Sequence, residues 1–255
     1  MAVIRFRGLG VFTAVFTLFC STFVWARGAG VHEDLSAGVV YPSNNDSVLL
    51  NPAALGRLSG ALLDVAALVP EASDAGLLGS YSYAGRGVGV GAGALAFGDD
   101  ILGFAGFGFG IGPFQLGASV ASQVGSGAGS PRLGVGARWG GNSGPAFGIR
   151  VDDVSVGLDE ATVGIAWSGG QVTFEIDLDI ANGLNYAFAR PALVFRPSRE
   201  FSFLLASSFE VMPEFQPSLD DLQIGVNYWL SNGVALYGIY NGMQAKQVAG
   251  LKFRF

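Results

Sequence analysis

The sequence predicts an all-β protein, a transmembrane antiparallel β-barrel of about fourteen strands with an N-terminal plug. Three observations predict this fold. Apolar residues recur at every second position over segments of about ten residues, which is the pattern of a membrane-spanning strand. Only 13% of the 255 residues are charged and 50% are hydrophobic, whereas ordinary soluble proteins have about 25% charged residues. The chain also ends on an alternating strand with an aromatic last residue.

Residues 1–26 predict a secretory signal peptide. Arg5 and Arg7 precede an apolar run that ends in Val24-Trp25-Ala26, a small-residue cleavage pattern. The alternative is an uncleaved membrane anchor, because the apolar run is nearly long enough to span a bilayer. Cys20 is the only cysteine, so the rest of the chain has no disulfide and no thiolate metal site.

Residues 27–60 do not alternate, are too apolar for a free tail, and are too irregular for a strand. A compact segment in the mouth of the barrel fits this composition better. Ser36-Ala37-Gly38, Asp46-Ser47 and Asn51-Pro52-Ala53-Ala54-Leu55 resemble the N-terminal hatch of the FadL/TodX outer-membrane transporters.

This resemblance implies a monomeric barrel whose N-terminal segment plugs the lumen and which carries long-chain fatty acids or aromatic hydrocarbons. Related barrels that act as secretion-system partners share the Asn-Pro-Ala motif, here Asn51, Pro52 and Ala53. The motif therefore indicates the superfamily better than the cargo. The FadL-like transporters are longer than this chain, and their extra length forms extracellular loops that build the surface ligand groove. The resemblance therefore does not determine the cargo of this chain.

Residues 61–255 are expected to form the barrel. The alternation predicts strands at 61–69, 77–85, 87–97, 101–112, 114–124, 132–140, 145–153, 161–168, 171–181, 184–196, 200–211, 222–230, 233–240 and 247–255. A buried helix is the alternative for 101–131, but its apolar residues alternate and it contains Pro113. A soluble β-sandwich would alternate too; the secretory signal and the scarcity of charge favour the barrel.

Links after even-numbered strands are expected to be short turns, and links after odd-numbered strands longer loops, several of them acidic. This expectation takes both ends of the barrel domain to face the periplasm. Trp139, Trp167 and Trp229 each precede a short turn, which predicts an aromatic girdle at one end.

The last six residues, Gly250 to Phe255, resemble the terminal signal that the barrel-assembly machinery of Gram-negative outer membranes reads. Gly250, Phe253 and Phe255 carry the likeness, and Val248 departs from it where a polar residue is usual. The resemblance implies an outer membrane of the Gram-negative type, with its lipid and the assembly machinery as partners.

Strand parity predicts two features of the inner face. Charged residues of both signs face the lumen, namely Glu175, Asp177, Asp179, Arg138, Arg150, Arg190 and Arg196. They either neutralise one another in a plugged interior or form an electric field that affects which molecules pass through the lumen. Glycines form a wall that includes Gly87, Gly89, Gly91, Gly108 and Gly110. One interpretation is that the plug packs on this wall, or that an apolar path runs along it, because glycine permits close approach. The other is that small inner residues let a compact barrel curve.

The function these features favour is passive transport of small hydrophobic molecules, fatty-acid- or hydrocarbon-like, through a plugged lumen. The alternatives are a non-specific or cation-leaning diffusion porin and a structural or secretion-partner barrel. We expect no enzyme, no cofactor and no metal site, because His32 is the only histidine. Two lysines and no basic run predict no nucleic-acid binding.

Overall fold

A computed structural model describes residues 37–42, 46–57, 60–70, 75–125, 129–141, 143–155, 160–181, 185–212, 222–231, 233–241 and 246–255. The predicted signal peptide and residues 27–36 of the predicted hatch lie outside the described residues. His32 and Ser36 are among these.

The strands form where the apolar residues alternate, and their ends agree with the predicted ends to within two residues except at the split strand described below. They are β1 (Gly60–Pro70), β2 (Gly76–Gly85), β3 (Val88–Phe97), β4 (Asp100–Ile111), β5 (Phe114–Val124), β6 (Arg132–Gly140), β7 (Gly144–Val151), β8 (Glu160–Gly169), β9 (Val172–Ala181), β10 (Tyr186–Phe195), β11 (Phe201–Ala206), β12 (Phe209–Met212), β13 (Gln223–Ser231), β14 (Val234–Asn241) and β15 (Lys246–Arg254). Two short helices, α2 (Ser47–Leu50) and η1 (Pro52–Arg57), precede them.

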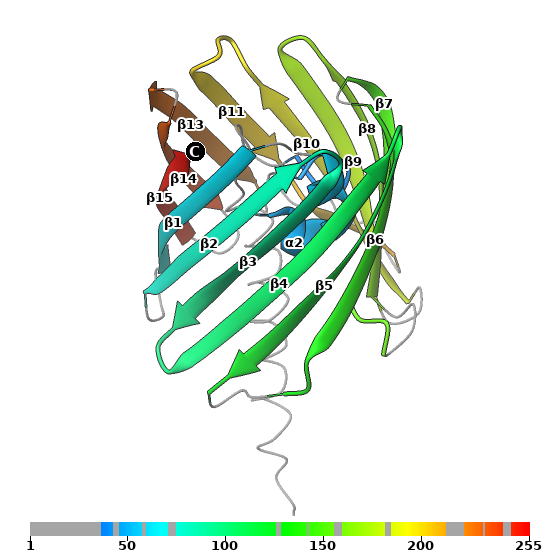
Figure 1. The fold of residues 1–255 in the computed structure, drawn as a ribbon, viewed down its shortest axis with the longest axis vertical. Coiled ribbons are helices and arrows are strands. Elements are labelled where there is room, and N and C mark those ends of the chain that lie inside the picture. The colour runs from blue at the N-terminus through cyan, green and yellow to red at the C-terminus, as the bar shows by residue number, and fades with distance from the viewer. Residues whose placement is uncertain are drawn as a thin grey trace, which may run out of the picture.

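The sheet closes on itself. Each strand pairs antiparallel with its neighbours, and β15 pairs with β1 from Leu62↔Arg254 to Pro70↔Lys246. Figure 1 shows the tilted strands wrapped around an interior in which α2 lies. Because β11 and β12 both pair with β10, the fifteen strands in the described part of the chain occupy fourteen positions. The predicted antiparallel barrel of about fourteen strands is confirmed.

The predicted strand 200–211 is divided into β11 and β12. Ser207 and Ser208 leave the ladder, and the Ser207 N–H donates to the Pro191 carbonyl of β10 at 3.1 Å. Pro191 has no N–H to return the bond, so the regular pattern cannot continue at this point. The alternation of residues alone does not reveal this, because the interruption originates in the neighbouring strand.

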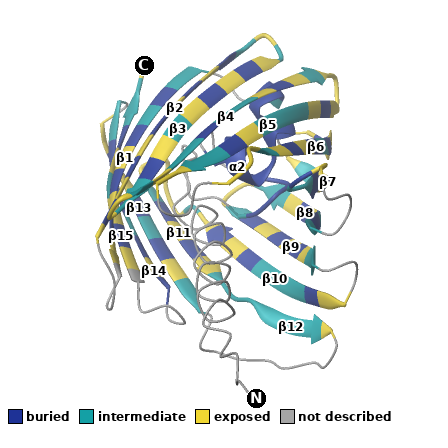
Figure 2. Ribbon diagram, turned by 90° about the horizontal axis from the view of Figure 1, so that it is seen from below, coloured by how far each residue is buried: buried dark blue, intermediate teal, exposed yellow. Residues whose placement is uncertain are grey.

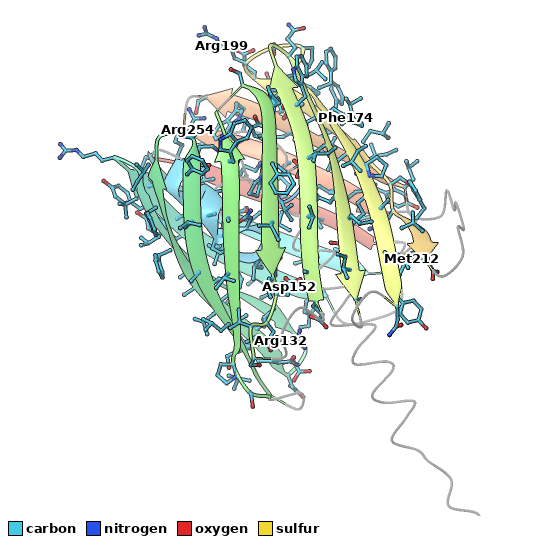
Figure 3. All side chains as sticks on the ribbon, turned by 90° about the vertical axis from the view of Figure 1, so that its right-hand side faces the viewer. Arg132, Asp152, Phe174, Arg199, Met212 and Arg254 are labelled. Carbon is cyan, nitrogen blue, oxygen red and sulfur yellow. The ribbon has the colours of Figure 1, made fainter. Side chains whose placement is uncertain are left out.

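The two faces of the wall differ as the parity predicts. Outward residues are apolar and exposed, such as Leu77 (58%) and Ile165 (59%), and inward residues are buried. Figure 2 shows this alternation along each strand. In Figure 3, Phe174 lies on the outer face, whereas Arg199 lies at one rim and Arg132 and Asp152 at the other. An apolar band between charged rims suits a wall surrounded by lipid.

Two expectations about single residues and one about a link were wrong. Trp229 is not in the girdle: it faces inward and is 7% exposed, whereas Trp139 and Trp167 face outward. Its neighbour Tyr228 takes the outward position, since successive residues of a strand point to opposite sides. Gly87 lies in the β2–β3 turn with φ +80° rather than in the strand. The link between β3 and β4, although it follows an odd-numbered strand, is only Gly98-Asp99.

Residues 46–57 are held against the inner wall. α2 and η1 pack on β3 and β4, and η1 also packs on β5 and β6. All residues of α2 are buried, and in η1 only Arg57 is not fully buried. Among the described residues, no helix is long and apolar enough to cross a bilayer.

Candidate functional site

The first feature of the interior is the Asn-Pro-Ala motif. Asn51 is fully buried, and its Nδ2 donates to the carbonyls of Val39 (2.9 Å) and Ala137 (3.3 Å). Its Oδ1 accepts from the N–H of Ala53 at 3.2 Å. One side chain therefore joins two parts of the N-terminal segment to each other and to β6.

Pro52 and the rest of η1 lie directly on the glycines of the wall. A Cβ at Gly108 or Gly117 would overlap the backbone of Pro52, and one at Gly89 would overlap the carbonyl of Leu55. Of the remaining strand glycines of the predicted wall, Gly91 faces the side chain of Val48, and a Cβ at Gly110 would be 3.1 Å from the Gly56 carbonyl oxygen. At Gly89, Gly108 and Gly117, glycine lets two backbones approach to a distance that any side chain would prevent.

The acidic residues of β9 bind the backbone of the N-terminal segment. Glu175 accepts hydrogen bonds from the N–H groups of Val40 (2.6 Å) and Tyr41 (3.1 Å), and Asp177 accepts one from Val39 (3.0 Å). A Cβ at Gly38 would overlap these carboxylates. Three successive N–H groups that would otherwise be buried without partners are satisfied in this way.

Arg138 completes this arrangement from β6. Its Nε donates to the Val40 carbonyl at 2.6 Å, and its Nη1 donates to Gln115 at 2.7 Å. Two guanidinium groups contact the ring of Tyr41: that of Arg138 lies 4.9 Å from the ring centre and that of Arg57 lies 5.3 Å from it. Burial lowers the pKa of Arg57 to about 10, and the charge of Arg138 acts in the same direction. Arg57 remains a cation near neutral pH, so both contacts are cation–π interactions.

The other predicted lumen charges divide into two groups. Arg150 forms an ion pair with Asp152 and donates to the Leu50 carbonyl at 3.4 Å, so it also contacts the segment. Asp179 and Arg190 pair across β9 and β10, and Thr162 donates to Asp179 at 2.6 Å. Arg196 follows β10 and donates to Thr173 at 2.8 Å. The structure therefore brings Glu175, Asp177, Arg138 and Arg150 together around the segment, and Asp179, Arg190 and Arg196 bond to groups of the wall.

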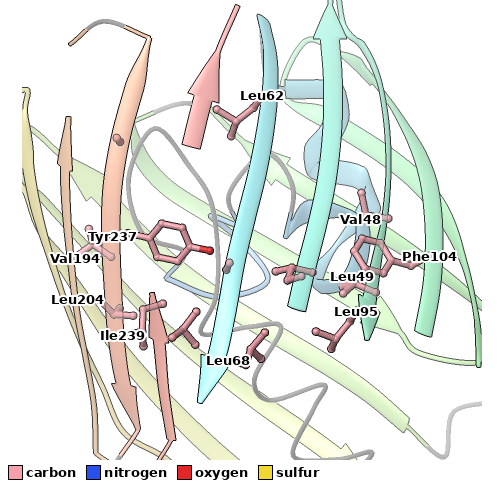
Figure 4. Close-up of a cluster of buried hydrophobic side chains, with 14 of the residues drawn as sticks. Val48, Leu49, Leu62, Leu68, Leu95, Phe104, Val194, Leu204, Tyr237 and Ile239 are labelled. Atoms are coloured by element: carbon pink, nitrogen blue, oxygen red, sulfur yellow. The ribbon is translucent and has the colours of Figure 1, made fainter. Parts of the chain in front are cut away.

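The wall formed by β10, β11, β13, β14, β15 and β1 has a different character. Its inward side chains are mainly apolar and almost fully buried, and they include Val194, Leu204, Ile239, Val248, Leu62 and Leu68. Val48, Leu49 and Leu55 of the segment belong to the same cluster. Figure 4 shows Val194, Leu204 and Ile239 on one side of the close-up, and Val48 and Leu49 on the other.

Within this apolar wall lies a polar cluster that was missed in the sequence. Tyr237 donates its hydroxyl to Asp64, with distances of 3.1 and 3.2 Å to the two carboxylate oxygens. The Nζ of Lys252 lies 4.7 Å from the centre of the Tyr237 ring, and Lys252 is directly opposite Asp64 in the β1–β15 register. The alternation along β1 could have revealed this cluster, because Asp64 lies on the same inward face as Leu62 and Ala66.

The C-terminal residues help to close the barrel. The Phe255 N–H donates to the Ala61 carbonyl at 3.0 Å, while the Phe255 side chain is 76% exposed. Phe253 is opposite Leu63 on β1, and a Cβ at Gly250 would overlap the ring of Tyr237. In the described part of the chain, no group of three or more His, Cys, Asp or Glu side chains is placed to hold a metal ion.

No family model matches the chain, and no curated protein matches it by sequence. Among solved structures, the chain is similar to the outer membrane protein Omp33 of Acinetobacter baumannii, with a TM-score of 0.58 and 12% identity over 78% of this chain and 100% of that one. A KdgM porin matches with a TM-score of 0.44 and 8% identity over 76% of this chain and 99% of that one. The likeness to Omp33 shows the fold of an outer-membrane β-barrel, and the resemblance of the hatch motif to FadL/TodX stays a prediction.

Proposed function

We propose that this protein is an outer-membrane barrel through which small hydrophobic molecules cross passively, and that residues 37–57 belong to the plug they must pass. The observation that carries the proposal is the apolar inner wall. On β10, β11, β14, β15 and β1, inward residues such as Val194, Leu204, Ile239, Val248 and Leu68 are apolar and buried. The barrel fold supports an outer-membrane location.

An apolar inner wall suits apolar cargo for an energetic reason. A water-filled channel is lined with polar or charged side chains, whereas burying apolar surface gains about 25 cal/mol per Å². A hydrocarbon in contact with Val194, Leu204 and Ile239 would therefore be stabilised, and a hydrated ion there would lose water ligands without replacement.

The pore interpretation rested on the acidic residues of β9. Glu175 and Asp177 accept hydrogen bonds from Val39, Val40 and Tyr41, and Asp179 pairs with Arg190. Carboxylates engaged in this way are occupied in holding the segment and the wall. This arrangement favours the hydrophobic transporter over the cation-leaning pore.

Passage would require the segment to shift from the glycine wall. The contacts that would break or move are the bonds of Asn51, the amide bonds to Glu175 and Asp177, and the stacking on Tyr41. Each such hydrogen bond contributes about 1 kcal/mol net, so together they hold the plug but allow occasional displacement.

The proposal is tested by comparing ionic conductance with hydrophobic uptake. Cells of a Gram-negative host that express the protein should take up the fluorescent amine N-phenyl-1-naphthylamine faster than cells without it. The protein reconstituted in a planar bilayer should give no stable conductance. Stable cation-selective steps that vanish in the double variant Glu175→Gln/Asp177→Asn would reject the transporter in favour of a pore.

A matched pair of variants links uptake to the inner wall. Val194→Thr/Val248→Thr keeps the shape of two inward residues and adds hydroxyls, which should slow uptake about threefold or more. Val65→Thr/Val90→Thr makes the same change on two outward residues and should leave uptake unchanged. Equal effects of the two pairs would contradict the proposed path.

A further inference from the structure

A belt of polar side chains crosses the apolar wall along the strand register. Ser202 on β11 is opposite Asn227 on β13, and Asn227 is opposite Tyr237 on β14. Lys252 on β15 is opposite Asp64 on β1, and Asp64 is opposite Ser80 on β2. All six residues face inward and are buried. Between β14 and β15 the register places Gly250 opposite Tyr237, and the belt is continued there by the side chain of Lys252, whose Nζ lies 4.7 Å from the centre of the Tyr237 ring.

In the charged half of the belt, the polar side chains contact one another. Asp64 accepts the Tyr237 hydroxyl and is opposite Lys252, whose ammonium lies over the Tyr237 ring. A buried carboxylate and a buried ammonium on adjacent strands cancel each other's charge. This half therefore has no surplus charge with which to hold a charged ligand.

Ser202, at the other end of the belt, is different. It is fully buried, and its Oγ has no hydrogen-bond partner in the described part of the chain. A buried hydroxyl without a partner is unfavourable and unusual in native proteins. An apolar residue would fit the wall better, unless the hydroxyl meets a polar group that enters the barrel.

The charged residue next to Ser202 turns away from it. Phe195, the last residue of β10, is opposite Phe203, so Arg196, which follows the strand, is adjacent to Ser202. The Nη1 of Arg196 donates to Thr173 on β9, which lies on the other side of β10 from β11. The polar neighbour of Ser202 across the strand is instead the uncharged amide of Asn227.

Apolar side chains flank this point. Leu204 is the next inward residue on β11 and is opposite Val194, and Trp229 is the next inward residue on β13. All three belong to the buried apolar cluster. A molecule with an apolar body and one polar group would contact them while its polar group reached Ser202.

We propose that Ser202 and Asn227 form a binding site for the uncharged hydroxyl or carbonyl group of an otherwise apolar molecule, whose body contacts Val194, Leu204 and Trp229. This inference rests on the proposed hydrophobic transport and narrows its cargo to neutral amphiphiles such as phenols or alcohols. Fatty acids in their ionised form are disfavoured, since the two cations nearest this site are engaged elsewhere, Arg196 with Thr173 and Arg254 with the ring of Trp229.

The test uses Trp229 as a reporter. The chain contains four tryptophans, so Trp25→Phe/Trp139→Phe/Trp167→Phe leaves Trp229 as the only one. The folded protein in detergent is titrated with three quenchers that share one bromophenyl ring: 4-bromophenol, bromobenzene and 4-bromobenzoate. At neutral pH the first is uncharged with a hydroxyl, the second lacks a polar group, and the third is an anion.

We expect 4-bromophenol to quench Trp229 saturably with an affinity about fivefold higher than bromobenzene, because one added hydrogen bond contributes about this factor. Ser202→Ala should abolish the difference and leave bromobenzene unchanged. Ser82→Ala is the matched control, since Ser82 is also inward, buried and without a partner in the described residues, but lies on β2.

The outcomes separate this inference from the proposed function. Equal affinities for 4-bromophenol and bromobenzene, or a preference that survives Ser202→Ala, would overturn the inference and leave hydrophobic transport standing. If 4-bromobenzoate bound as tightly as 4-bromophenol, the inference that the ligand is uncharged would be overturned. No saturable quenching by any of the three would count against the proposed function itself.

Discussion

Asn51 is the residue on which the position of the N-terminal segment most depends. Its amide donates to Val39 within the segment and to Ala137 in the wall, while its carbonyl oxygen caps the N–H of Ala53. Only an amide supplies donors and an acceptor on one short side chain. This explains in physical terms why asparagine begins the Asn-Pro-Ala motif.

Asn51→Ala should loosen the segment without unfolding the barrel. The loss leaves two buried carbonyls and one N–H without partners, which costs about 1–3 kcal/mol. Hydrogen exchange at the amides of Val39, Val40 and Ala53 should become about tenfold faster or more. Asn241→Ala, at a buried asparagine of β14, controls for the loss of any buried amide and should leave these rates unchanged.

At the level of elements, the glycine wall is a docking surface between two pieces of backbone. η1 lies on β4 and β5 because Gly108 and Gly117 have no Cβ where Pro52 approaches. The same strand β4 carries one outward glycine that meets nothing tightly: a Cβ at Gly103 would be 3.9 Å from its nearest neighbour, the Ser122 carbonyl oxygen. One strand therefore offers both a packed and an unpacked glycine.

Gly108→Ala should displace η1, whereas Gly103→Ala should not. The added methyl group at Gly108 overlaps backbone, which cannot move aside as a side chain can, and such overpacking costs about 1–3 kcal/mol. Limited proteolysis should cut residues 37–57 faster in Gly108→Ala than in the parent protein. Equal protection in both variants would mean that the wall glycines serve curvature and not packing.

Prediction from sequence succeeded where one local rule determines the structure. The period of two located the strands, since one apolar face must meet lipid along the whole wall. It could not reveal the break between β11 and β12, which depends on Pro191 of the neighbouring strand, nor the contact of Glu175 with Val40. Both require knowledge of which distant residues become neighbours. The alternation along the strands was sufficient to place Asp64 and Lys252 on the inner face. No motif in the sequence indicated that the two residues form a cluster.

At the level of the whole molecule, the barrel is closed by the pairing of its first and last strands. β15 and β1 pair over nine residues, and beyond them the backbones of Phe255 and Ala61 exchange hydrogen bonds of 3.0 and 3.4 Å. These bonds use only backbone groups. The Phe255 side chain is exposed and contributes little to closure, so its aromatic character needs another explanation.

We propose recognition of Phe255 during assembly as that explanation, and it can be tested apart from stability. Phe255→Ala keeps every backbone bond, so the purified variant should refold in detergent with the same heat-modifiable mobility and the same unfolding temperature as the parent. In cells, the amount of folded barrel in the outer membrane should fall severalfold, because the assembly machinery would lose its terminal aromatic residue. A matched change at an exposed aromatic residue distant from the C-terminus, Phe114→Ala, should leave assembly unchanged. Equal loss in refolding and in cells would assign Phe255 to stability instead, and no loss in either would remove it from the assembly signal.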